Sequence, residues 1–149
     1  MLKKMYDLQK KKGKKGFSMI ELIIVLAIMA ILVALIGTQL IPYLEKSREK
    51  RDKTTLDTCK TALESVMADH EFDVVGQGYS GATAISTVLA DVDANGATEF
   101  ETYAGISTSD TPFKSAKAGA ASAVSAITVT FDTNGVITQM TIGNLDLIE

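Results

Sequence analysis

The chain has 149 residues and a formal net charge of −3 at pH 7, and this length fits one domain plus one membrane segment. Its single cysteine, Cys59, excludes an intrachain disulfide, and its single histidine, His70, excludes a catalytic or zinc cluster built on several histidines. The charge is divided unevenly. Residues 1–16 carry seven Lys and one Asp, or +6, whereas residues 17–149 carry eight basic and seventeen acidic residues, or −9.

The basic segment is followed by an apolar run over residues 17–44, in which Glu21 is the only ionisable side chain apart from the phenol of Tyr43. Twenty residues, 17–36, span about 30 Å as a helix, which is enough to cross the hydrocarbon core of a bilayer. The basic end orients such a span with the N-terminus in the cytoplasm. A charge at the bilayer centre costs about 2.5–3.5 kcal/mol on insertion scales, so Glu21 predicts a functional role and a partner.

The junction between Gly16 and Phe17 predicts that partner. Cleavage there would remove the basic leader and leave a free amine on Phe17, one helical turn from Glu21. In a packed bundle, Glu21 of one chain would neutralise the Phe17 amine of another. An ordinary signal peptide has a shorter apolar core that ends at an Ala-x-Ala-like site, and no Ala-x-Ala occurs in residues 17–44.

The stretch Lys-Lys-Gly-Phe-Ser-Met-Ile-Glu at residues 14–21, followed by an unbroken apolar run, resembles the N-terminus of type IV pilins. The resemblance is close to about residue 42 and is one of general layout beyond. It implies that a prepilin peptidase cuts after Gly16 and methylates the new amine of Phe17. It also implies that Glu21 helps to place each incoming subunit in a filament.

One long helix is predicted from about residue 17 to about residue 72. Gly37 and Pro42 weaken it, because proline removes a backbone donor, and they predict either a built-in extension point or a plain kink. The outer half carries apolar residues at helical spacing, and Cys59 among them is expected to be buried rather than bridged to another chain. The members of this apolar stripe are Leu56, Cys59, Leu63, Val66 and Met67.

The remaining residues predict a small head. A short helix is expected over residues 82–90, and residues 91–120 are interpreted mostly as connection, anchored by Tyr103 and Phe113. Two alternating runs within residues 127–142 flank an Asp-Thr-Asn-Gly turn, which is the strongest short signal for a β-hairpin. Because a hairpin alone is marginally stable, we expect its apolar face and the helical stripe to cover each other.

Other candidate sites are rejected. Residues 91–96 match the first half of a calcium loop, but the twelfth position, which needs a bidentate Glu, is Thr102. No phosphate loop, nucleophile motif or paired carboxylates at an interpretable spacing occur. We therefore predict no catalysis, no cofactor, no metal and no specific nucleic acid.

The segment over residues 45–53 has five positive and three negative charges, and residues 54–149 carry −10. In a helical stack, this basic neck of one subunit would meet the acidic head of another. The alternative is a solvated neck.

The predicted fold class is α+β: a long N-terminal helix, transmembrane in its first half, packed against a small antiparallel sheet as in the pilin fold. Its predicted parts are a leader (1–16), a transmembrane and filament-core helix (17–44), the outer half of that helix (45–72) and the head (73–149).

The predicted function is that of a structural subunit of a type IV pilus, in the membrane before assembly and extracellular after it. The expected partners are a prepilin peptidase and other pilin subunits. One alternative is a minor pilin, or a pseudopilin of a type II secretion or DNA-uptake system. Another is a signal-anchored surface protein that never polymerises. Motility, adhesion, DNA uptake and secretion stay open as roles.

Overall fold

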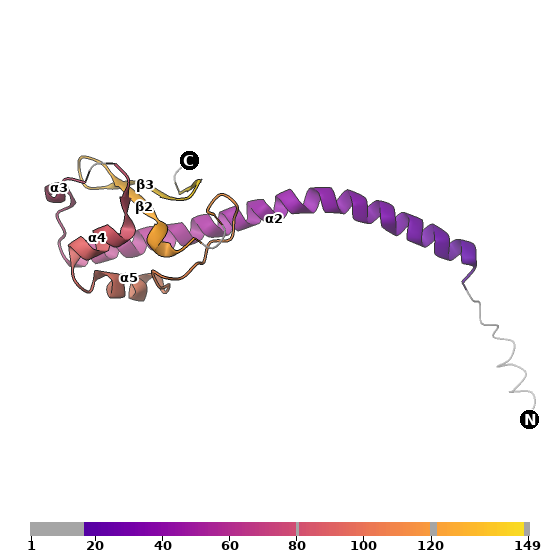
Figure 1. The fold of residues 1–149 in the computed structure, drawn as a ribbon, viewed down its shortest axis with the longest axis horizontal. Coiled ribbons are helices and arrows are strands. Elements are labelled where there is room, and N and C mark those ends of the chain that lie inside the picture. Colours follow the sequence, from indigo (N-terminus) through magenta and orange to yellow (C-terminus); the bar gives the residue numbers. More distant parts are fainter. Residues whose placement is uncertain (1–16, 80, 120–121, 148–149) are drawn as a thin grey trace, which may run out of the picture. The chain divides into compact units, whose positions relative to one another are not determined.

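A computed structural model of the chain describes residues 17–79, 81–119 and 122–147. The chain falls into two compact units, one ending at Ile41 and the other running over Pro42–Glu149, called here the C-terminal unit. Helix α2 (Met19–Asp69) belongs to both units (Figure 1). The elements that follow it are α3 (Val74–Gln77), β1 (Thr83–Ala84), α4 (Ile85–Val92), α5 (Gly96–Ala104), the 3₁₀ turn η1 (Val124–Ala126), β2 (Thr128–Phe131), β3 (Ile137–Ile142) and β4 (Leu145–Asp146).

Helix α2 ends in a tight main-chain motif. The N–H of Phe72 donates to the carbonyl of Met67 at 2.9 Å, and the N–H of Glu71 donates to the carbonyl of Ala68 at 3.2 Å. This pair of bonds is the Schellman arrangement, which requires a left-handed residue that is usually glycine. Here Glu71 takes that position with φ of 46°, so the helix stops at the expense of some backbone strain.

The sheet has four antiparallel strands in the order β1-β2-β3-β4. The predicted hairpin is confirmed: β2 pairs with β3 in a register that sets Thr128 opposite Thr141 and Val129 opposite Met140. In the turn, the Asp132 carboxylate accepts the N–H groups of Asn134 and Val136, both at 2.8 Å. These bonds hold the pKa of Asp132 below its usual value. The short outer strands β1 and β4 were not predicted.

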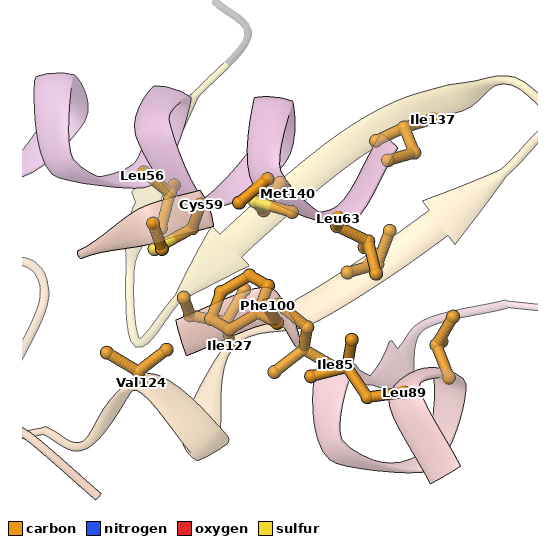
Figure 2. Packing of buried hydrophobic residues seen from close by; sticks show 14 of the residues in the cluster. Leu56, Cys59, Leu63, Ile85, Leu89, Phe100, Val124, Ile127, Ile137 and Met140 are labelled. Atoms are coloured by element: carbon orange, nitrogen blue, oxygen red, sulfur yellow. The ribbon is translucent and has the colours of Figure 1, made fainter. Parts of the chain in front are cut away.

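The core of the C-terminal unit lies between the outer half of α2, the sheet and the short helices (Figure 2). The expectation that the hairpin and the helical stripe cover each other is confirmed, because Leu56 and Leu63 of α2 and Val129 and Met140 of the sheet share one buried cluster. The buried position of Cys59 is also as expected, and burial raises the pKa of its thiol to about 11.

The interpretation of residues 91–120 as mostly connection is wrong over residues 96–104. Residues from Gly96 to Ala104 form α5, whose buried members include Phe100. A Cβ atom on Gly96 would lie 2.4 Å from the carbonyl oxygen of Leu89, so this glycine permits a close approach of α4 and α5. Phe113 is a buried anchor as predicted, whereas Tyr103 is 52% exposed. Phe100, which is fully buried on the same helix, is the anchor instead.

Three carboxylates on one face of α2 bind the loop over residues 114–117, called here the pinned loop. Asp52 is fully buried and accepts the N–H of Lys114 at 2.9 Å and the N–H of Ser115 at 2.7 Å. Glu45 accepts the N–H of Ala116, and the Glu49 carboxylate lies 3.1 Å from the Lys117 ammonium. The acidic face of the neck thus fixes a loop 62 residues further along the chain.

Candidate processing and assembly segment

The candidate site begins at the N-terminal end of α2. Phe17 precedes the helix and is 85% exposed, and Gly16 lies outside the described residues. The Glu21 carboxylate accepts the main-chain N–H of Ser18 at 3.0 Å. Ser18 occupies the position just before the helix and Glu21 the third helical position, which is one half of a capping box.

This contact was missed in the analysis of the sequence, although Ser-x-x-Glu ahead of an apolar run is the pattern that signals it. It gives Glu21 a polar partner within its own chain before any cleavage. The carboxylate also sits in the first turn of a helix, where the positive end of the macrodipole favours a negative charge. A pairing of Glu21 with the Phe17 amine of another subunit would therefore have to compete with the Ser18 N–H.

The apolar face of this segment is unusually large. Every side chain over residues 17–44 is exposed. Fifteen large apolar residues over 17–36 are each at least 48% exposed. Within the described chain, α2 is the one helix that is long and apolar enough to cross a membrane. Soluble monomers rarely expose an apolar surface of this size, so a membrane or other protein chains must cover it.

Gly37 and Pro42 both lie inside α2, which continues through them. Proline at position 42 cannot donate to the carbonyl of Thr38, one turn earlier. The Thr38 hydroxyl also bonds back to the carbonyl of Leu35 at 3.0 Å, a type of contact that often bends helices. A Cβ atom on Gly37 would meet no atom within 4 Å. The roles of Gly37 and Pro42 in a kink or extension point stay predictions.

A polar cluster links the end of α2 to α5. His70 at the end of α2 lies 2.6 Å from the Glu99 carboxylate of α5, and this hydrogen bond raises the pKa of the imidazole. The Tyr103 hydroxyl donates to Asp69 at 2.5 Å. Among the described residues, no group of three or more His, Cys, Asp or Glu side chains is arranged to hold a metal ion.

Comparison with known protein families decides what kind of segment this is. Residues 11–37 match the prokaryotic N-terminal methylation motif. That motif covers Gly16, Phe17 and Glu21, and it supports a type IV pilin-like or pseudopilin-like protein. The methylation motif is structural rather than enzymatic, and it implies processing by a prepilin peptidase and polymerisation.

Searches of curated proteins and of solved structures gave no match to the chain. The pilin-like description therefore rests on the methylation motif and on the fold, in which a long N-terminal helix packs against a small antiparallel sheet. The motif and the single apolar helix are also consistent with a membrane-anchored pilin.

Proposed function

We propose that the chain is a structural subunit of a type IV pilus, cut after Gly16 and polymerised through the apolar half of α2. The observation that carries the proposal is the methylation motif at residues 11–37, which overlaps the first half of α2, where every side chain over residues 19–44 is exposed. In this proposal residues 1–16 are the leader and residues 17–44 form the filament core. The compact C-terminal unit is the part displayed to the outside.

Two features support a role in polymerisation. The C-terminal unit has its own buried core, so the apolar half of α2 is not needed to complete it. Once the subunits leave the membrane, packing the exposed side chains of many copies against one another would keep a large apolar surface out of water. In a head-to-tail contact, one patch of each copy binds a different patch of the next copy. Where the rotation between copies does not close a ring, such contacts generate a helical filament.

Mass spectrometry of the N-terminus of the mature protein tests processing. We expect the mature chain to start at N-methylated Phe17. An intact leader would contradict the proposal and favour the signal-anchored surface protein. A pilus subunit should also be the bulk component of isolated filaments, whereas a minor pilin or a pseudopilin should be a trace component.

Two substitutions separate the roles of the Glu21 carboxylate. Glu21→Gln keeps an acceptor for the Ser18 N–H but loses the charge, and Glu21→Ala loses both. If the charge pairs with the Phe17 amine, both variants should insert and be cleaved normally but assemble poorly. Normal filaments from Glu21→Gln would refute the pairing, and a failure of Glu21→Ala alone would show that the helix cap, rather than the charge, is what matters.

A further inference from the structure

Over residues 45–53, the three carboxylates of α2 and two of its lysines lie on different faces of the helix. The acidic face defined above is occupied by the pinned loop. Lys46 and Lys50 lie about a third of a turn away from that face. Both are exposed, and neither side chain makes an ion pair with a described residue. These two ammonium groups are therefore available to an external anion.

The pinned loop adds two more cations at this level of the helix. Lys114 and Lys117 are exposed, and the contacts of the loop hold them beside the neck. Outside residues 45–53 and the pinned loop, the one basic residue of 17–149 is Lys60, which pairs with Glu64 at 3.7 Å. Residues 45–53 and 114–117 together hold seven basic side chains and the three carboxylates of the acidic face, so their net charge is +4. We call the remaining seven cations the basic collar: Lys46, Arg48, Lys50, Arg51, Lys53, Lys114 and Lys117.

A small hollow on the exposed face of α2 has the chemistry of a phosphate site. It has a volume of about 160 Å³ and is lined by Tyr43, Lys46, Ser47 and Lys50. The lining offers two ammonium groups and two hydroxyls as donors, and no carboxylate. Charge-assisted bonds to phosphate oxygens are among the stronger hydrogen bonds in proteins. The Glu49 carboxylate, which lines the neighbouring hollow, is engaged by Lys117.

The position of this hollow along the chain matches the headgroup layer of a membrane. If Glu21 sits at the inner interface, where its charge costs least, the uncharged residues 22–41 span about 30 Å of hydrocarbon. Tyr43 and Lys46 then follow the outer boundary by about 3 and 7.5 Å of helix. The headgroup layer is itself about 5–7 Å thick on each side. Tyrosine is enriched at this depth, and helical side chains tilt toward the N-terminus, which is here the membrane side.

We propose that, before assembly, the basic collar binds the phosphate groups of anionic phospholipids in the outer leaflet, with the hollow at Tyr43–Lys50 as its main contact. This inference rests on the membrane orientation of the proposed function. An acidic surface of a second copy is the other occupant that charge allows. The adjacent apolar span favours lipid, because it places the hollow at the headgroups without any assembly step.

Lipid retention by the full chain in a neutral detergent tests the proposal. Native mass spectrometry would follow the titration of phosphatidylglycerol and, separately, phosphatidylcholine. We expect phosphatidylglycerol to be retained more strongly. Each basic residue near an anionic surface contributes on the order of fivefold in affinity, so Lys46→Gln with Lys50→Gln should weaken retention by roughly 25-fold. Arginine at both positions should restore it, and Lys60→Gln is the matched control that should change nothing.

Several results would overturn the proposal. Equal retention of both lipids, or unchanged phosphatidylglycerol retention in the double glutamine variant, would remove the collar as a lipid site. Displacement of the lipid by millimolar inorganic phosphate would indicate a free-anion site instead. If the double glutamine variant lost filaments but kept its lipid retention, a second copy would be identified as the occupant. Glu21→Ala should leave lipid retention intact, so a failure of the filament model and a failure of this inference give different results.

Discussion

Replacing Asp52 with alanine should loosen the pinned loop and destabilise the C-terminal unit. The carboxylate is fully buried and accepts two main-chain N–H groups, from Lys114 and Ser115. Hydrogen bonds to a charged group contribute about 1.5–3 kcal/mol each, and the alanine would leave the buried N–H of Ser115 without its acceptor. We therefore expect a loss of about 3–5 kcal/mol in the free energy of unfolding.

A unit of this size loses about 4 °C in melting temperature for each kcal/mol, so Asp52→Ala should lower the melting temperature by about 12–20 °C. The measurement is thermal unfolding of the full chain in detergent, followed by amide hydrogen exchange of Lys114 and Ser115. Asp57→Ala is the matched control, because Asp57 is an exposed acid on the same helix and its removal should cost less than about 0.5 kcal/mol. Equal melting temperatures and equal exchange rates in the two variants would refute the reasoning.

Two further predictions concern the end of α2. Glu71→Gly should stabilise the C-terminal unit by about 1 kcal/mol, because glycine adopts the left-handed conformation without strain; Glu71→Ala should give no such gain in the same melting experiment. The His70–Glu99 bond raises the pKa of the imidazole, so an NMR titration should place its midpoint above 6.5, and Glu99→Gln should lower it. Because the folded pKa is raised, the stability from this pair is full below pH 6.5 and is lost as pH rises through the folded value. A histidine midpoint unchanged by Glu99→Gln would contradict the second prediction.

The long helix and the hairpin were predicted from the sequence because each has a clear hydrophobic periodicity. The helical spacing from Leu56 to Met67 and the alternation around the Asn-Gly turn each report which face is buried, so the helix, the hairpin and their contact were all predictable. Glu21 stood out because a charge in an apolar run is costly and therefore rare.

The parts that were missed depend on contacts distant in sequence. Asp52 lies in a run of alternating charges that resembles a solvated neck, and nothing in that run shows that the loop at Lys114 supplies buried N–H donors. Helix α5 is short and polar on its outer face, so Phe100 gave too weak a periodic signal against the surrounding Gly, Ser and Thr. The two-residue strands β1 and β4 exist only because β2 and β3 offer them an edge.

The burial of Cys59 has a practical consequence for following this protein in living cells. Its thiol is enclosed by the core and protonated at physiological pH, so maleimide reagents should leave it unmodified while the unit is folded. A cysteine introduced at exposed Ser86 on α4 would then be the single reactive thiol of the mature chain. Fluorescent labelling could proceed in the otherwise native sequence, with no need to disturb the core by first removing Cys59.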